Sequence, residues 1–219
     1  MHAPAGTTFL VASIVPVLLE ITDGLAFATL LLLFWIPYYW LLVRPAIRTS
    51  QHRGKRASAL ALAIWLASAA ALTGVRHWLF AWRIERNSLT WVAGAALWVF
   101  ALWMEAVTRR ALGWRRLLGL PELNPRDGSR GVVATGIYAR VRHPRYLLYM
   151  LMLVSVALLT GAVPIFLLAI LNILMYQVLA GREERALIEQ YGREYESYRR
   201  SVPRFLPSVG RRAKAPLPP

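Results

Sequence analysis

The sequence GIYARVRHPRY at residues 136–146 stands directly before two apolar runs, 146–160 and 163–180. The break between these runs contains Gly161, a residue typical of turns, so the pair predicts a helical hairpin. A hairpin returns the chain to the side from which it left. The sequence REE at 182–184 follows at once. The hairpin therefore brings a basic, histidine-containing block and two acids to one membrane surface.

The composition indicates a membrane protein. Hydrophobic residues make up 57% of the 219 residues, and the mean hydropathy is +0.44. An ordinary soluble core does not use so much apolar sequence. The net charge of +15 does not indicate nucleic acid, because the basic residues lie between apolar runs, as in the positive-inside pattern of membrane proteins. No cysteine is present, and the four histidines show no metal-binding spacing, so neither a disulfide nor a metal site is expected.

The apolar runs predict an all-α, polytopic membrane helix bundle. Three further runs, at 24–43, 57–75 and 88–108, approach the length of about 20 residues that a membrane-spanning helix needs. Together with the hairpin they give about five transmembrane helices. The shorter apolar run 8–21 is either a sixth span or a re-entrant or interfacial helix, and Pro37 is expected to kink the first firm span.

The basic residues predict which side each connection faces. Residues 44–56, 109–145 and 181–219 carry five, nine and nine Lys or Arg, whereas 76–87 carries three and the hairpin tip carries none. Cytoplasmic loops are rich in Lys and Arg. We therefore expect the three basic segments, and with them the Arg-His-Pro block and the acids, to face the cytoplasm.

The last part of the chain predicts an amphipathic cytosolic helix over 183–200. Its apolar and tyrosine side chains recur at spacings of three and four, and Gly192 marks a bend or a close contact. We divide the chain into N-terminal transmembrane helices (1–108), a catalytic region (109–207) and a disordered tail (208–219).

The polar residues around the hairpin admit a structural interpretation and a functional one. Structurally, Pro144 starts a helix and Arg142 reaches lipid phosphates, while Glu183 and Glu184 form a solvated helix start. The functional interpretation rests on the clustering of tyrosine, arginine and histidine within nine residues at one membrane face. Two acids directly below a membrane exit also need a cationic partner.

The ordered motifs resemble the superfamily of isoprenylcysteine carboxyl methyltransferases and phospholipid methyltransferases. The resemblance consists of G-I-Y-x-x-x-R-H-P-x-Y, a hairpin, and then E-E-x-x-L-x-x-x-Y-G-x-x-Y-x-x-Y-x-x-x-V-P-R-F-x-P, and it covers residues 130–207. It implies an integral membrane methyltransferase that uses S-adenosylmethionine, bound at the cytosolic ends of the last helices.

The resemblance also implies a set of site residues. Residues expected around the cofactor are Gly131, Val132, Val133, Tyr138, His143, Pro144, Tyr146 and Glu183, with Glu184 close by. For the cofactor, Arg142 or His143 suits the carboxylate, Glu183 or Glu184 the ammonium or ribose, and Tyr138 or Tyr146 the adenine or sulfonium. Arg142, His143 and Glu184 are the candidate catalytic residues, with His143 or Glu184 as the base for a protonated amine acceptor.

The acceptor is expected to be lipophilic and to enter from the bilayer. Many relatives have glycine where this chain has Leu148, which we place near the acceptor's route. Eukaryotic relatives have an arginine for the substrate carboxylate at the position of Leu179, for which Arg182 is the candidate replacement. This difference weakens the case for a prenylcysteine carboxylate and favours a phospholipid amine or another small lipophilic molecule. The alternatives are a membrane sterol- or steroid-type reductase that uses NADPH, and a non-enzymatic protein that binds anionic lipid.

Overall fold

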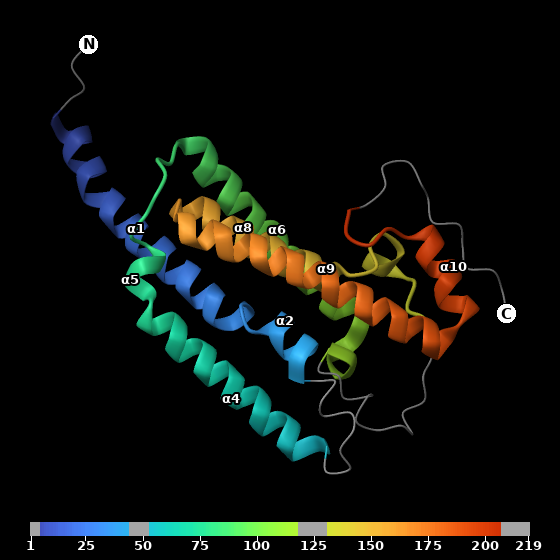
Figure 1. Cartoon of the computed structure of the whole chain (residues 1–219). Coiled ribbons are helices and arrows are strands. Elements are labelled where there is room, and N and C mark those ends of the chain that lie inside the picture. Colours follow the sequence, from blue (N-terminus) through green and yellow to red (C-terminus); the bar gives the residue numbers. More distant parts are fainter. Residues whose placement is uncertain (1–4, 44–52, 118–130, 207–219) are drawn as a thin grey trace.

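The computed structural model describes residues 5–43, 53–117 and 131–206, and within these ranges the chain is helical without a β-strand. Figure 1 shows long helices running side by side, with a small helical unit at one end. The elements in chain order are α1 (Ala5–Leu33), α2 (Ile36–Tyr38), the π-helix η1 (Tyr39–Val43), α4 (Arg53–Gly74), α5 (Arg76–Leu79), α6 (Ser88–Leu117), the 3-10 helix η2 (Gly136–Ala139), α8 (Pro144–Thr160), α9 (Val163–Tyr191) and α10 (Arg193–Ser201).

The centre of the bundle is α8, which packs against α6, α9 and α1. Gly94 lets α6 approach α8 closely, because a Cβ atom there would lie 2.8 Å from the Leu159 Cγ and 3.1 Å from the Ser155 carbonyl oxygen. The Ser155 hydroxyl donates to the Gly94 carbonyl oxygen at 2.7 Å. A small residue and a serine at the contact are typical of helices that pack inside a membrane. The helices α8 and α9, which stand on either side of the break at Gly161, also pack against each other, and this confirms the predicted hairpin.

The N-terminal helix is longer than the apolar pattern indicated. Residues 8–21 are not a separate sixth helix but the first part of α1, which continues through Gly24. The predicted break near Pro37 is present, since α1 ends at Leu33, two turn residues follow, and α2 and η1 complete the segment. Pro37 lacks the N–H that would continue the helical hydrogen bonds, which explains the position of the break.

The hairpin tip is fixed to the connection between α5 and α6. The Ile84 N–H donates to the Gly161 carbonyl oxygen at 2.9 Å, and Gly161 has a φ of 64°, which favours glycine. Arg83 donates to both carboxylate oxygens of Asp23, at 2.9 and 2.6 Å. These contacts hold the hairpin tip at one end of the bundle. The Arg-His-Pro block at the start of α8 and the Glu-Glu pair near the end of α9 therefore lie at the opposite end.

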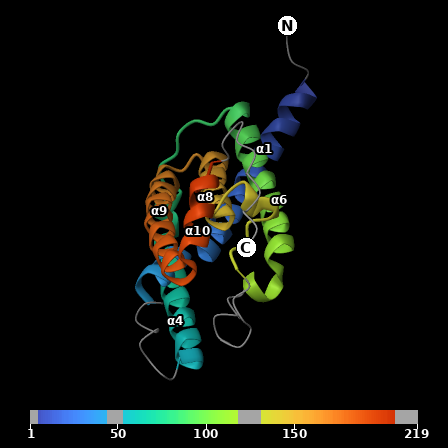
Figure 2. The ribbon, with the colours of Figure 1, turned by 90° about the vertical axis from the view of Figure 1, so that its right-hand side faces the viewer.

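The C-terminal amphipathic segment differs from the single helix predicted over 183–200. Its first half is the end of α9, and α10 begins after Gly192, whose φ of 55° and ψ of −127° turn the chain. No atom outside its immediate neighbours lies within 4 Å of a Cβ built at Gly192, so the residue is required for the bend and not for close packing. Tyr195, Tyr198 and Val202 are buried together, which confirms the predicted apolar face. Figure 2, which looks at the right-hand end of Figure 1, shows α10 at the near end of the bundle, and α10 packs against α9.

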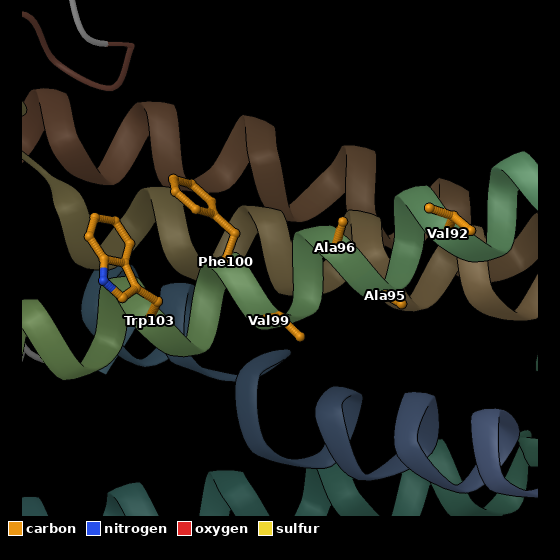
Figure 3. Close-up of a pocket in the computed structure, with 6 residues that line it drawn as sticks. All are labelled: Val92, Ala95, Ala96, Val99, Phe100 and Trp103. Carbon is orange, nitrogen blue, oxygen red and sulfur yellow. The ribbon is translucent and has the colours of Figure 1, made fainter.

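Three of the described helices are long and apolar enough to cross a membrane, at residues 16–41, 88–111 and 163–191. Two shorter apolar helices, at 59–74 and 144–160, correspond to the other two apolar runs for which the sequence predicted a span. An open apolar groove runs along α6, as Figure 3 shows; it is lined by Val92, Ala95, Ala96, Val99, Phe100 and Trp103. Such an exposed apolar face suits contact with lipid chains.

The proposed division of the chain at residue 108 falls inside α6, which continues through it to Leu117. The division therefore concerns function and not separate folding units, and it stays a prediction. The predicted disordered tail (208–219) lies outside the described residues.

The contact at Gly94 predicts a difference between two glycine substitutions. Gly94→Ala should lower the thermal stability of the detergent-solubilised protein, because overpacking costs roughly 1–3 kcal/mol. Gly74→Ala should be neutral or slightly stabilising, since no atom lies within 4 Å of a Cβ at Gly74. Equal losses of stability in the two variants would contradict the close crossing of α6 and α8.

Candidate active site

The chain entering α8 is joined to the C-terminal segment by a short backbone ladder. The Arg142 N–H donates to the Pro203 carbonyl oxygen at 3.0 Å, and the His143 N–H donates to the Arg204 carbonyl oxygen at 3.1 Å. His143 is the residue before α8, and Pro144 occupies the first helical position, where its missing N–H has no cost. The Val-Pro-Arg-Phe motif therefore lies directly against the Arg-His-Pro motif.

Glu184 is the centre of a buried charge network. Its side chain is 3% exposed and accepts from both Nε and Nη2 of Arg204, at 2.9 and 2.7 Å. Arg142 Nη2 and His143 Nε2 both lie 3.1 Å from Glu184 Oε1. A carboxylate loses its hydration on burial, and several charge-assisted hydrogen bonds are needed to compensate. We call Glu184, Arg142, His143 and Arg204 the Glu184 network.

Glu183 is held differently from its neighbour, although the two follow one another in α9. Its side chain is 40% exposed. The Tyr146 hydroxyl donates to Glu183 Oε2 at 2.7 Å, and His143 Nδ1 lies 3.5 Å from the same oxygen. The imidazole of His143 thus lies between a buried carboxylate on one ring nitrogen and an accessible carboxylate on the other.

The two acids favour the charged form of His143. Burial by itself lowers the pKa of this imidazole, but the hydrogen bonds to Glu183 and Glu184 outweigh it, so the pKa of His143 is raised above its ordinary value. A protonated imidazole donates to both carboxylates. The geometry thus favours His143 as a hydrogen-bond donor that connects the two acids.

Stacked aromatic rings continue from the two acids into the bundle. The rings of His143 and Tyr146 are nearly parallel, with an interplanar angle of 6° and centroids 5.3 Å apart. Tyr146 stacks in turn on Tyr176 of α9 at 5.4 Å. The Phe205 ring also contacts this group, with its centroid 6.0 Å from that of the His143 ring. The stack fixes the direction of the Tyr146 hydroxyl toward Glu183.

The segment before the Arg-His-Pro block is attached to α10. Glu194 Oε1 accepts from the Val132 N–H at 2.8 Å. Gly131 has a φ of 28°, and a Cβ atom there would lie 2.9 Å from the same oxygen, so only glycine fits. The Tyr198 hydroxyl donates to the Tyr138 carbonyl oxygen at 2.7 Å. The segment from Gly131 to Tyr138 is therefore held against α10, at the end of the bundle where the acids lie.

The structure brings together one part of the predicted set of site residues. The residues in mutual contact or adjacent in the chain are Arg142, His143, Pro144, Tyr146, Glu183 and Glu184. Gly131 and Val132 lie against α10, and Val133 beside them is partly buried. Tyr138 interacts electrostatically with Glu183, and burial raises the pKa of its phenol.

The two candidate substrate residues lie outside the Glu184 network. Leu148 is 1% exposed and packs in the bundle core with Met104 and Tyr176. Arg182 Nη1 donates to the Leu41 carbonyl oxygen at 3.2 Å, so it joins α9 to the end of the first span. Among the described residues no group of three or more His, Asp or Glu side chains could hold a metal.

Two residues of the site were missed by the sequence reasoning. Arg204 stands in the quoted Val-Pro-Arg-Phe motif, but its pairing with Glu184 spans 20 residues and a bend, and no helical spacing reveals such a contact. Glu194 belongs to a helix whose acids look solvated, yet it holds the Val132 N–H. The one available signal concerned Arg204: the sequence has an arginine in a recognisable motif, and two acids directly after a membrane span need a cationic partner.

The fold and the site define an integral membrane protein with a polar, charge-paired site at one end of its bundle. Residues 89–194, just under half of the chain, match the model of the family described as phospholipid methyltransferase. No curated protein and no solved structure matches the chain. The matched region runs from the start of α6 into α10 and includes the Arg-His-Pro block and both acids. Over these residues the match confirms the resemblance to the superfamily of phospholipid and isoprenylcysteine carboxyl methyltransferases.

The raised pKa of His143 predicts a pH-dependent stability. The folded state binds the proton of the His143 imidazole more tightly than the unfolded chain does, in which histidine has a pKa of about 6.5. The contribution is complete below about pH 6.5 and is lost as the pH rises through the raised pKa. The unfolding temperature should fall over that interval, and His143→Gln should remove most of the fall.

The control for this prediction is His77→Gln, at an exposed histidine near the other end of the bundle. This variant should keep the pH dependence of the parent protein. Thermal unfolding of the detergent-solubilised protein across this pH range measures both effects. A pH dependence that survives His143→Gln unchanged would show that the Glu184 network does not hold the proton.

Proposed function

We propose that this membrane methyltransferase transfers the methyl group of S-adenosylmethionine to a lipophilic acceptor, at the end of the bundle formed by the Glu184 network. The observation that supports the proposal best is the unequal treatment of two adjacent acids. Glu184 is buried and paired with Arg142 and Arg204, whereas Glu183 is partly exposed and is oriented by Tyr146 and His143. Glu184 holds the site together, and Glu183, which is partly exposed and held by Tyr146 and His143, is the acid that a ligand can reach.

The residues present fit the chemistry of the cofactor. S-adenosylmethionine carries an ammonium group, a carboxylate, a sulfonium and an adenine ring. The Glu183 carboxylate suits the ammonium, and the imidazole of His143 beside it, whose pKa is raised, suits the carboxylate. The stacked ring of Tyr146 offers a π-face to the sulfonium or the adenine. Gly131 and Val132, held by Glu194, would lie along the cofactor from the side of α10.

The roles of the site residues follow from these contacts. When bound, the cofactor supplies an electrophilic methyl group, so the protein mainly aligns the acceptor and excludes water. The Glu184 carboxylate is saturated by three cationic groups and is a poor base, which leaves it a positioning role. Arg142 and Arg204 hold Glu184, and Glu184 holds His143. The described contacts thus favour positioning by His143 and Glu184 over the proton transfer considered from the sequence.

The acceptor is proposed to be a phospholipid amine or another small lipophilic molecule that enters from the bilayer. The helices that carry the site are apolar, and the family match names phospholipids. Leu148 is buried beside Tyr176 and so would shape the inner wall of the site, while Arg182, bound to the Leu41 carbonyl oxygen, would close its rim. A reductase using NADPH is less favoured, because the accessible Glu183 would repel a 2′-phosphate.

The role of Glu183 predicts a specific loss of cofactor binding. Glu183→Gln should weaken the binding of S-adenosylhomocysteine about 10- to 100-fold, the equivalent of one charge-assisted hydrogen bond of roughly 1.5–3 kcal/mol. Isothermal titration calorimetry on the purified protein measures the effect, and NADPH should give no response in any variant.

The matched control for this prediction is Glu189→Gln, the same change at an exposed position of the same helix. It should bind S-adenosylhomocysteine as tightly as the parent protein. Equal binding by the Glu183 and Glu189 variants, with both folded, would place the cofactor elsewhere.

We also propose that the site faces the cytoplasm. The chain has no native cysteine, so single cysteines report position without background. Cysteines at Ser50, Ser129 and Ser201 should be protected from an impermeant reagent in whole cells, whereas one at the exposed Glu85, near the hairpin tip, should be labelled. Labelling of the Ser201 cysteine from outside would show that the site faces away from the cytoplasm and would contradict the proposal.

A further inference from the structure

Three buried polar side chains lie deeper in the bundle than the Glu184 network. Asn172 and Tyr176 are both 0% exposed, and as residues four apart on α9 they share one face of that helix. Tyr38 belongs to α2, which packs against α9, and it interacts electrostatically with Tyr176. All three lie in segments long and apolar enough to cross a membrane. We call these residues the Tyr176 group, and the proposed cofactor contacts do not use them.

Each member of the Tyr176 group has a buried polar atom without a hydrogen-bond partner among the described residues. These atoms are the hydroxyls of Tyr38 and Tyr176 and the Oδ1 of Asn172. The Asn172 Nδ2 donates to the Leu168 carbonyl oxygen at 3.0 Å, so the opposite amide orientation, with Oδ1 against that carbonyl, is unfavourable. Native proteins pair nearly all their buried polar groups, and inside a membrane there is no bulk water to pair with. Three unpaired atoms on facing helices therefore indicate a binding site.

The backbone that carries Tyr38 gives a second, independent indication. The first span is broken here, because α1 ends at Leu33 and Pro37 has no N–H to donate to the Leu33 carbonyl oxygen. The π-helix η1 begins directly after Tyr38. Turns of π-helix occur often at functional sites, and broken helices inside membranes carry the binding sites of many transporters.

The unpaired atoms define the polar group that they can bind. Each phenol hydroxyl can donate one hydrogen bond, whereas the amide oxygen of Asn172 can only accept. A hydroxyl group matches this set, since its oxygen accepts from the two phenols and its hydrogen is donated to Asn172. An anion would face the partial negative charge of the amide oxygen, and a cation would be repelled by Arg145, which interacts electrostatically with Tyr176. The set therefore favours a neutral hydroxyl.

The surroundings indicate what kind of molecule carries the hydroxyl. Tyr176 belongs to the apolar core cluster that also contains Leu148 and Leu179. Tyr38 as a residue is partly exposed although its hydroxyl is buried, so its side chain extends from the surface of the bundle into the interior. An apolar site with a few fixed polar groups is typical of sites for lipophilic ligands. A lipophilic molecule can reach the buried hydroxyls from the bilayer beside Tyr38.

We propose that the Tyr176 group binds the hydroxyl of an uncharged lipophilic molecule, such as a long-chain alcohol, that enters from the bilayer. The proposal does not depend on the methyl transfer proposed above. The two sites are neighbours, because Tyr176 stacks on Tyr146 at 5.4 Å and Tyr146 donates to Glu183. Tyr176 stands seven residues before Glu183, which is about 10 Å along α9. The hydroxyl site therefore lies at the inner end of the aromatic stack.

Photolabelling tests the position of the site. A long-chain alcohol that carries a diazirine is added to the detergent-solubilised protein, and mass spectrometry identifies the labelled peptides after illumination. Labelling should concentrate on the peptides that contain Tyr38 or residues 172–176. An excess of dodecanol should suppress this labelling, whereas the same mole fraction of dodecane should not. Labelling spread over all apolar helices, or equal suppression by the alcohol and the alkane, would overturn the proposal.

Two conservative variants test the hydrogen bonds themselves. Tyr38→Phe and Tyr176→Phe should each lower the labelling about three- to tenfold, because each removes one hydrogen bond to the ligand and keeps the aromatic ring. The matched control is Tyr191→Phe, the same change at the end of α9, where the ring packs against the apolar face of α10. This control should be labelled like the parent protein. Unchanged labelling in both Tyr38→Phe and Tyr176→Phe would place the hydroxyl elsewhere.

Thermal unfolding distinguishes a lipophilic alcohol from water, which has the same donor and acceptor chemistry. Dodecanol should raise the unfolding temperature of the parent protein above the value measured with dodecane, and this difference should vanish in Tyr176→Phe. Equal unfolding temperatures of the parent protein with the alcohol and with the alkane would show a site that takes at most water, and would contradict the assignment. Both measurements are made without S-adenosylmethionine, so their outcome does not decide the proposed function.

Discussion

The ion pairs of Glu184 are the interaction on which the rest of this site depends. A buried carboxylate needs partners, and here they come from two places in the chain, the block before α8 and the segment after α10, while Glu184 itself is on α9. Removing one partner of such a buried pair typically costs about 3–5 kcal/mol, because a charge is left without compensation. The network thus joins the helical hairpin to the C-terminal segment and fixes the orientation of His143.

The fixed His143 explains why two identical, adjacent side chains serve different purposes. Glu184 points into the network, whereas Glu183 is oriented by Tyr146 and His143 and remains accessible. The aromatic stack of His143, Tyr146 and Tyr176 continues the same order into the bundle. At the other end, Arg83 and Asp23 hold the hairpin tip, so the two ends of α8 are restrained separately. The charged residues of the candidate site therefore lie together at one end of the bundle.

The sequence predicted the helices well because hydrophobic length and helix breakers are local properties. It predicted the hairpin at Gly161 and the break near Pro37, and it gave a bend at Gly192 as one of two alternatives; each of these features depends on one residue and its neighbours. It did not predict that residues 8–21 join α1 or that α9 extends to Tyr191, since no breaker separates the apolar from the polar part of either helix.

The candidate site could be predicted only in part. Motifs placed Arg142, His143, Tyr146 and the two acids at one surface, but their individual roles depend on burial, which the sequence does not contain. The pairing of Arg204 with Glu184 and the support of Val132 by Glu194 are contacts between segments whose relative orientation is set by the bend at Gly192.

The most direct test of this account is an experimental structure of the protein in a lipid bilayer mimic with S-adenosylhomocysteine bound. The account predicts that the ammonium of the ligand lies within hydrogen-bond distance of the Glu183 carboxylate, while Glu184 stays paired with Arg142 and Arg204. A ligand bound at the opposite end of the bundle, or one that contacts Glu184 with Arg204 displaced, would contradict it.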